Sequence, residues 1–286
     1  RQRGVEIRTA TLCTRILSED GVACGAELRD LRTGEQYVVT AKAVVVAADA
    51  LRTPQLLYAS GIRPRALGRW LNDQPQVIAL IEVDAPPAAA SLTSPLRDGR
   101  DNVSGVTWLP FHEPDFPFHG QLMQMDTSPI AFTQPPGTAT KPVVGLGLFL
   151  AKELREEDRI VFSDDTDAVG LPKMQLNYQL TDGDRRRLQQ AVAVTERVGA
   201  ALGRVAPGGE AIILPAGTSL HYQGTCRLGE ANDGTSVADR RSRVWGFHNL
   251  YVGGNGVIPT PTACNPTLTS VALAILAADD IVARLL

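Results

Sequence analysis

Long apolar runs and an excess of one charge are both missing from this sequence. The longest apolar stretches, residues 43–48 and 271–278, fall well short of the ~20 residues that a membrane-spanning helix requires. The 28 lysines and arginines are balanced by 31 aspartates and glutamates, and no basic cluster stands out that would neutralise a run of phosphates. We therefore expect no membrane span and no nucleic-acid partner. The hydrophobic content of 44% is still sufficient for a globular core.

Cysteine and histidine are scarce as well. Four cysteines without C-x-x-C spacing are too few for a disulfide scaffold in 286 residues, and four histidines form no H-x-x-x-H pattern or Cys–His cluster. The composition predicts reduced thiols in a cytoplasmic protein and no metal site. The first residues also lack the pattern of a secretion signal and lead directly into strand-like sequence, which is unusual for a natural beginning. The four cysteines are Cys13, Cys24, Cys226 and Cys264, and the four histidines are His112, His119, His221 and His248.

A phosphate-cradling, glycine-rich turn from a strand into a helix is the third absence. The glycines at 145 and 147 lead into a further strand-like run, and those of residues 253–256 lead to Val257-Ile258-Pro259. If a dinucleotide is bound, the segment that holds its pyrophosphate is expected to lie outside this chain.

The opening of the chain has a strand pattern. Residues 5–48 predict strands that are separated by polar turns near residues 20–21 and 33–34. Residues 43–48 are wholly apolar, which is typical of a strand buried on both faces of a parallel α/β sheet. The next segment places Pro54 in the first turn of a helix that should stop near Gly61.

The middle of the chain differs, because apolar segments alternate there with loops rich in proline, aspartate and glycine. This pattern predicts an antiparallel sheet. Thr181 and Asp184 have the spacing of a capping box, which would open a helix. The expected strands are residues 77–83, 121–125, 143–150 and 174–178, and the expected inner face of the helix is Leu188, Val192, Ala193 and Leu202.

The last 70 residues return to short strands and a closing helix. Asn265 is a good N-cap and Pro266 suits the first helical position, so the apolar run from Leu268 to Leu286 predicts a helix that begins near residue 266. The N-terminus of that helix would suit an anion, as would that of any capped helix. Taken alone, His221 is interpreted as a surface or core histidine and Asn265 as an ordinary cap.

Four ordered motifs change this interpretation. They are H-x-x-G-T-x-R-x-G from His221, N-L-Y-V-G from Asn249, I-P-T from Ile258 and N-P-T-x-T from Asn265. Together they resemble the closing segment of the glucose–methanol–choline (GMC) oxidoreductases, and are most similar to pyranose oxidases and bacterial oxidases of glycosides, including C-glycosides. Residues 44–62 resemble the inner part of the FAD domain of that family, although Asp49 stands where many members have glycine. The family's glycine-rich N-terminal motif and a flavin-linking histidine have no counterpart.

The resemblance implies an α/β (α+β) fold, with part of an FAD/NAD(P)-binding domain and an inserted antiparallel-sheet substrate-binding domain. The expected domains are residues 1–73 (inner FAD-binding part), 74–215 (substrate-binding) and 216–286 (C-terminal FAD-binding part with the His–Asn pair). The N-terminal Rossmann unit is expected to be absent from this chain and to come from the same protein or from another polypeptide.

The implied activity is FAD-dependent oxidation of a secondary hydroxyl of a sugar or glycoside to a ketone by hydride transfer to flavin N5. His221 would be the base and Asn265 would fix the reacting hydroxyl. The acceptor would be O2, giving H2O2, or a quinone. The implied cofactor-binding residues are Leu12, Cys13, Ala47, Ala48, Arg52, Thr53, Gly254, Asn255, Pro266 and Thr267, and Gln124 is a candidate for substrate binding.

Several alternatives stay open from the sequence. The oxidised carbon is C2 or C3, the enzyme is an oxidase or a quinone-dependent sugar dehydrogenase, and the FAD is covalently linked or not. A non-catalytic alternative is an oxidoreductase-like docking subunit, against which the presence of both His221 and Asn265 argues. A homo-oligomer is left open. Cys264 is interpreted as a small packing residue and not as a redox thiol.

Overall fold

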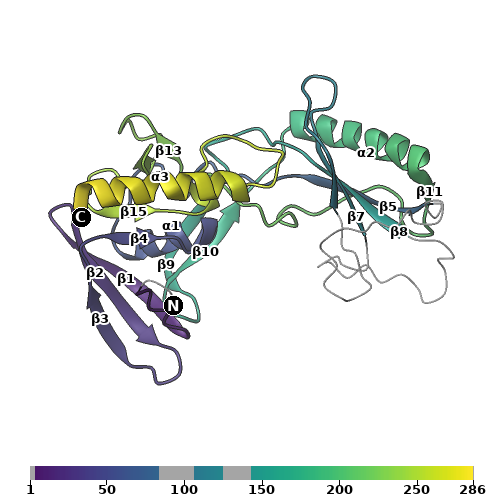
Figure 1. Ribbon diagram of the computed structural model, residues 1–286. Coiled ribbons are helices and arrows are strands. Elements are labelled where there is room, and N and C mark those ends of the chain that lie inside the picture. The colour runs from purple at the N-terminus through teal and green to yellow at the C-terminus, as the bar shows by residue number, and fades with distance from the viewer. Residues whose placement is uncertain (1–3, 84–105, 125–142, 286) are drawn as a thin grey trace.

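The computed structural model describes residues 4–83, 106–124 and 143–285. Its elements are β1 (Thr11–Glu19), β2 (Val22–Asp30), β3 (Gln36–Thr40), β4 (Val44–Val46), α1 (Asp49–Ala59), β5 (Gln76–Val83), β6 (Val106–Leu109), β7 (His119–Gln124), β8 (Val143–Phe149), β9 (Arg159–Thr166), β10 (Pro172–Asn177), α2 (Asp182–Leu202), β11 (Gly203–Val205), β12 (Ile212–Ile213), β13 (Leu228–Gly229), β14 (Ala238–Asp239), β15 (Leu250–Val252), η3 (Asn255–Val257) and α3 (Thr267–Leu285). Figure 1 shows them in two lobes. The first holds β1–β4, α1, β9, β10, β13, β15 and α3, and the second holds β5, β7, β8, β11 and α2. By strand pairing, β14 belongs to the first lobe, and β6 and β12 belong to the second.

The first lobe combines antiparallel and parallel pairing. β1, β2 and β3 form an antiparallel sheet, with the predicted turn at Asp20 and Gly21 between the first two strands. β4 pairs in parallel with β15, as the apolar run predicted. Val45 is 52% exposed, however, so burial on both faces was wrong for this strand. The described part of the chain gives β4 one partner strand.

Helix α1 begins earlier than the sequence predicted. It starts at Asp49 and therefore encloses Pro54, which was expected in its first turn. The reason is the conformation of Asp49, which has φ +74° and accepts hydrogen bonds from the backbone of Leu51 (2.6 Å) and Arg52 (2.8 Å) through Oδ1. An aspartate tolerates this left-handed region better than most residues and satisfies the first N–H groups of the helix.

Proline inside a helix leaves one backbone carbonyl without its usual donor, because Pro54 has no N–H to offer the carbonyl of Ala50. The hydroxyl of Thr225 donates to this carbonyl in place of the missing N–H. Thr225 is fully buried and belongs to the motif that begins at His221. The preceding residue, Gly224, has φ +87° and lies against the backbone of Trp70, where a Cβ would be 2.1 Å from the carbonyl oxygen.

The second lobe is an antiparallel sheet in the order β11-β5-β8-β7-β6, with β12 also paired to β5. The predicted strands at 77–83, 121–125 and 143–150 are confirmed within one or two residues. Residues 174–178 were placed in this sheet wrongly. They form most of β10, which pairs with β9, and Gln55 of α1 holds this ribbon in the first lobe by donating to the Pro172 carbonyl (2.7 Å).

Helix α2 packs on the second sheet, as Figure 1 shows. Its capping box is confirmed, since Thr181 Oγ1 accepts from Asp184 N (3.0 Å) and Asp184 Oδ2 accepts from Thr181 N (2.9 Å). Of the predicted inner face, Leu188 is buried and Ala193 is exposed. The buried residues of the helix are Asp184, Leu188, Ala191, Thr195 and Gly199.

The closing helix α3 begins at Thr267, one residue later than expected. Ser270 N donates to the Pro266 carbonyl (2.9 Å), so Pro266 lies in the N-cap position and Asn265 directly precedes it. The prediction of Asn265 as the cap was therefore displaced by one residue. All four cysteines are free thiols, as predicted. Among the described residues, no helix is both long enough and apolar enough to cross a bilayer.

The donor that Thr225 supplies to α1 can be tested with a Thr225→Val variant, which keeps the volume and removes the hydroxyl. We expect the free energy of unfolding to fall by about 1–3 kcal/mol, because the Ala50 carbonyl stays buried without a partner. Thr195→Val is the matched control: Thr195 is equally buried and its Oγ1 has no hydrogen-bond partner, so stability should stay equal or rise. Urea unfolding measures both. Equal losses in the two variants would contradict this account of α1.

Candidate active site

His221 is held in a loop of the first lobe by two hydrogen bonds. Its ring Nδ1 lies 2.8 Å from Oε1 of Gln74, and its backbone N–H donates to Ser219 Oγ (3.1 Å). Gln74 is 2% exposed and occupies the segment that leads into β5. The preceding residue, Leu220, has φ +58° and is 73% exposed, so the loop turns sharply before the histidine. The imidazole is thus half-buried and held from one side.

A buried carboxylate lies behind this loop. Asp73 accepts from Ser219 Oγ and from the backbone N–H of Gly217 (2.9 Å). Burial lowers the pKa of the His221 imidazole below its ordinary value, while the negative charge of Asp73 acts in the opposite direction with a smaller effect. The ring is therefore neutral at neutral pH and has a lone pair with which to accept a proton.

A side chain of the second lobe contacts Asn265. Gln121 of β7, which is 5% exposed, donates from Nε2 to Asn265 Oδ1 (2.7 Å). Gln74 contacts the same segment, because its Nε2 donates to the carbonyl of Cys264 (2.6 Å) and to Thr262 Oγ1 (3.0 Å). The segment that carries Asn265 is thus fixed by Gln74, which precedes β5, and by Gln121 of β7.

Aromatic contacts complete the arrangement. The ring of Phe149 lies 5.8 Å from that of His221 and 6.2 Å from that of His119, and Nε2 of His119 lies 3.5 Å from Gln121 Nε2. Burial and the neighbouring His221 both lower the pKa of His119. The contacts form a closed circuit that we call the His–Asn cluster, and its members are His221, Gln74, Asn265, Gln121, His119 and Phe149.

Sequence reasoning missed Gln121 and His119. Gln124 was chosen instead, and its side chain lies outside the described residues. Residues of one strand alternate between its two faces, so His119 and Gln121 share one face of β7. The alternation, combined with the polar character of both His119 and Gln121, is the sequence signal that could have found this face.

Several predicted cofactor residues gather at one edge of the first lobe. Ala47 and Ala48 follow β4 and are exposed, and Gly254 and Asn255 follow β15. Because β4 and β15 are parallel, both carboxyl ends meet at this edge, where open α/β sheets bind their ligands. Ser270 of α3 donates to Asn255 Oδ1, which brings the helix start, with Pro266 and Thr267, to the same edge.

Other predicted cofactor residues have internal contacts. Thr53 is 1% exposed and its Oγ1 accepts from Ala48 N (2.9 Å), so it supports the turn from inside. Arg52 pairs with Asp167 (3.1 Å). Leu12 and Cys13 lie half-buried in β1, and no hydrogen bond in the described part of the chain joins them to the edge residues. Burial raises the pKa of the Cys264 thiol, which disfavours a reactive thiolate.

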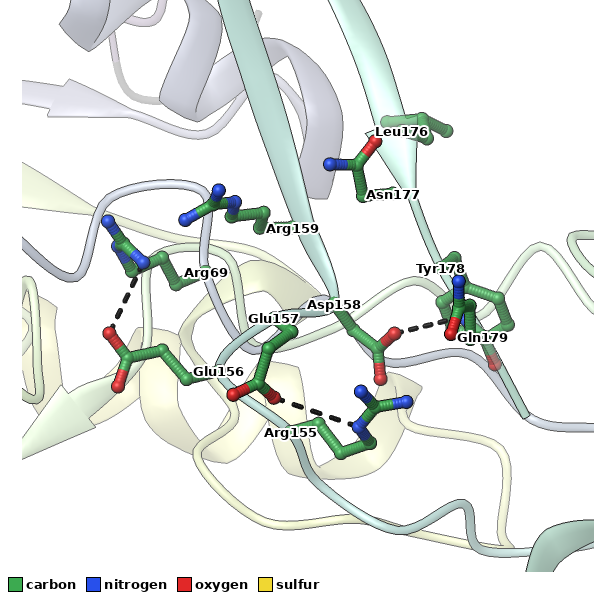
Figure 2. Close-up of a pocket in the computed structure, with 10 residues that line it drawn as sticks. All are labelled: Arg69, Arg155, Glu156, Glu157, Asp158, Arg159, Leu176, Asn177, Tyr178 and Gln179. Carbon is green, nitrogen blue, oxygen red and sulfur yellow. Dashed lines mark hydrogen bonds and ion pairs between the residues drawn. The ribbon is translucent and has the colours of Figure 1, made fainter. Parts of the chain in front are cut away.

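A separate cavity of about 810 Å³ lies beside β9 and β10 (Figure 2). Its charged groups pair with one another: Arg69 with Glu156 (3.2 Å) and Arg155 with Glu157 (3.7 Å). Asp158, which accepts from the backbone of Gln179, also pairs with the buried Lys152. None of the predicted site residues lines this cavity, and its charged groups other than Arg159 are paired, so the His–Asn cluster remains the better candidate for chemistry.

Comparison with protein families gives two matches with the same description. Models described as GMC oxidoreductase match residues 1–76 and residues 157–274. The first match includes β1–β4 and α1, and the second includes β9, β10 and the segment from His221 to Asn265. Both predicted catalytic residues therefore lie inside a matched region.

Curated relatives extend over nearly the whole chain. A C-glycoside 3-oxidase from Microbacterium trichothecenolyticum is 52% identical over 95% of this chain and 52% of its own length. A pyranose 2-oxidase from Tricholoma matsutake is 35% identical over 91% of this chain and 50% of its own length. The chain thus spans about half the length of the curated relatives that it matches.

Solved structures show the same fold at low identity. A formate oxidase variant from Aspergillus oryzae RIB40 superimposes with a TM-score of 0.72 at 16% identity, covering 96% of this chain and 60% of that one. Pyridoxine 4-oxidase from Mesorbium loti gives 0.64 at 18%, covering 94% and 57%. The α/β fold with mixed sheets, as predicted from the sequence, is confirmed at this level.

The opposing effects on His221 lead to a prediction for Asp73→Asn. We expect the pKa of His221 to fall further, because the upward effect of the carboxylate is lost while burial stays. The neutral ring would then persist to lower pH than in the parent. An NMR titration of the His221 ring measures this. Asp280→Asn, whose carboxylate contacts Tyr251 and Arg284, is the control and should leave it unchanged. A higher pKa in Asp73→Asn would refute the assignment.

Proposed function

Since this chain belongs to the GMC oxidoreductase family, we propose that it is the part of an FAD-dependent enzyme that oxidises a secondary hydroxyl of a sugar or glycoside to a ketone. The observation that carries the proposal is the His–Asn cluster, in which side chains from both lobes hold His221 and Asn265 in one circuit of contacts. The same two residues, far apart in sequence, belong to the motifs that resemble the family's closing segment.

FAD is the cofactor of this family, and the edge residues of the first lobe fit it. The exposed Ala47 and Ala48 and the nearby Gly254 leave room for a flat ring beside the carboxyl ends of β4 and β15. The start of α3 at Thr267 supplies the positive end of a helix, which suits the negative N1/C2=O edge of a reduced flavin. The flavin, when bound, supplies the acceptor for a hydride.

His221 and Asn265 have different roles in the proposed reaction. The neutral His221 ring accepts the proton of the substrate hydroxyl, a contribution of about 10²–10⁴-fold. Asn265 holds the same oxygen by hydrogen bonding, and its acceptor is already occupied by Gln121, so its NH2 group is the part that is free to donate. An amide suits positioning, because it does not titrate.

The substrate side of the site suits an uncharged, hydroxyl-rich molecule. Gln121 and His119 supply hydrogen-bonding groups, and the ring of Trp108, which is 50% exposed, lies 4.6 Å from that of His119 at a tilt of 44° and offers an aromatic surface to a sugar ring. The higher identity to a C-glycoside 3-oxidase than to a pyranose 2-oxidase favours a glycoside and attack at C3. C2 oxidation of a free sugar is the second candidate.

The parts of the chain have different roles in this function. Residues 1–73 and 216–286 contribute to FAD binding, and residues 74–215 form the substrate-binding part, with the β9–β10 ribbon against α1. O2 or a quinone is the electron acceptor. The proposed location is cytoplasmic, as expected from the thiols. A docking subunit without turnover is the rival, and flavin bleaching by substrate distinguishes the two.

An additional N-terminal segment with a Rossmann unit would bind the pyrophosphate. Two uncovered apolar surfaces support this. Val45 of β4 is 52% exposed, and one side of α3 exposes Leu268 (81%), Val271 (50%) and Ile275 (57%) at helical spacing. Apolar surface of this extent normally lies against another element. A βαβ segment beside β4 would bury these side chains and supply the missing glycine-rich turn.

His221→Ala and Asn265→Ala should slow flavin reduction far more than they affect folding. Loss of the base should cost about 3–5 kcal/mol of transition-state stabilisation, and loss of Asn265 somewhat less. Anaerobic stopped-flow reduction of the flavin-loaded protein by glycosides and free sugars measures the step. His248→Ala, an exposed histidine of the first lobe, is the control. If His221→Ala reduced its flavin within threefold of the parent rate, the proposed mechanism would fail.

The isolated 286-residue polypeptide should retain clearly less than one FAD per chain, because no glycine-rich βα turn is present to hold the pyrophosphate. The absorbance ratio at 450 and 280 nm of the purified chain, with its mass confirmed, gives the stoichiometry. A protein that includes an upstream βαβ segment is the positive control. Stoichiometric flavin on the 286 residues alone would show that no further segment is needed.

A further inference from the structure

We propose that Gln74 is a positioning residue which fixes the proton of the neutral His221 ring on Nδ1, so that Nε2 is the atom that acts as base. This inference rests on the proposed function for the role of His221. It concerns a residue that none of the motifs includes, since Gln74 lies in the segment between α1 and β5.

The orientation of the Gln74 amide follows from what it contacts. One of its terminal atoms lies 2.6 Å from the backbone carbonyl oxygen of Cys264. A carbonyl oxygen accepts hydrogen bonds and never donates, so the atom that faces it must be the NH2 group. The second proton of that group is directed to Thr262 Oγ1 at 3.0 Å. Both protons of the amide are thereby used, and Oε1 is left to face His221.

The tautomer of His221 follows from this orientation. Oε1 of Gln74 is an acceptor, and it lies 2.8 Å from Nδ1 of His221. A hydrogen bond between them requires the proton on Nδ1, and a neutral imidazole carries a single N–H. The lone pair is therefore on Nε2, on the far side of the ring from Gln74. Burial favours the neutral ring, so this tautomer is the relevant species.

The backbone of Gln74 supports the same geometry. Its N–H donates to Ser219 Oγ (3.4 Å), which also accepts from the backbone of His221. The neighbouring Asn72 pairs with Gln223 in both directions of the backbone (3.0 and 2.9 Å), so the segment lies beside the chain that follows His221. With 2% exposure, the Gln74 side chain has little freedom to rotate. The imidazole ring of His221 is therefore held by a segment whose own position is fixed by hydrogen bonds.

Gln74 also links the base to its partner. The Cys264 carbonyl that fixes the amide belongs to the residue directly before Asn265. A shift of this segment would therefore alter the amide and, through it, the ring of His221. The orientation of the base and the placement of Asn265 are thus coupled through one side chain, which a purely structural glutamine would not require.

Gln223 offers a matched control for loss of a buried glutamine. It is 0% exposed, and its Nε2 donates to the same Thr262 Oγ1 (3.0 Å), but its side chain has no hydrogen bond to His221. Gln223→Leu therefore removes a comparable buried amide without touching the base. Gln74→Leu removes the acceptor at Nδ1, and Gln74→Glu keeps an acceptor there while removing both donors.

The test uses the flavin-loaded protein, which includes the proposed upstream segment, with ¹⁵N-labelled histidine. NMR of the imidazole nitrogens reports the tautomer, and the His221 signals are identified by their loss in His221→Ala. The parent and Gln223→Leu should show the proton on Nδ1. Gln74→Leu should lose this preference, and its anaerobic flavin reduction should be about 10–100-fold slower than that of Gln223→Leu, because a wrongly oriented base loses much of its contribution.

Gln74→Glu adds a second readout and a safeguard if Gln74→Leu does not fold. The carboxylate should keep the proton on Nδ1 and stabilise the protonated ring, so the acid limb of the pH–rate profile should move to higher pH. The other groups that face the ring are Asp73 behind the loop and His119 across Phe149, and both are unchanged in these variants.

Three outcomes are decisive. The proposal is overturned if Gln74→Leu keeps the Nδ1 proton and reduces its flavin within threefold of Gln223→Leu. It is equally overturned if Gln74→Glu moves the proton to Nε2 or leaves the acid limb in place. If His221→Ala itself reduces flavin at the parent rate, the proposed function fails instead, and the tautomer measured by NMR still reports on Gln74 independently.

Discussion

The candidate active site depends on one buried amide more than on any other contact. Gln74 joins the loop of His221 to the segment of Asn265, and it does so from the point where the chain leaves the first lobe and enters β5. Gln121 reaches the same segment from β7 of the second lobe. Two glutamines thus hold the two halves of the site together, and both are almost fully buried, so their geometry is set by packing instead of by solvent.

The electrostatics of the cluster favour neutral partners. Two imidazoles have a pKa lowered by burial, and the amides of Gln74, Gln121 and Asn265 carry no charge at any pH. Asp73 is the charged group behind His221, and its carboxylate is occupied by Ser219 and Gly217. Burial outweighs its effect on the ring. A site of this kind discriminates through hydrogen bonds, because an unpaired buried amide is costly.

Much of the fold could be predicted from local sequence signals. The Thr181–Asp184 capping box and the apolar strand that became β4 have short-range causes, and both appear in the structure. The start of α1 and the pairing of β10 could not be predicted, since they depend on Asp49 at positive φ and on Gln55 contacting Pro172. The two catalytic residues that the sequence predicted, His221 and Asn265, lie in the motifs. Gln121 and His119 are in none of the motifs, and the assembled structure places Gln121 against Asn265 and His119 against Gln121.

The bond between Thr225 and the Ala50 carbonyl has a consequence for biosynthesis. The two residues are 175 positions apart, so at roughly 5–20 residues per second the ribosome needs on the order of 9–35 s to deliver the donor after α1 has emerged. During that interval the Ala50 carbonyl, which lacks a donor because of Pro54, must accept its hydrogen bond from water. Helix α1 therefore cannot be fully buried until Thr225 is in place. The helix is thus synthesised early but reaches its final packing late. A stalled or shortened nascent chain would leave it exposed to proteases and chaperones.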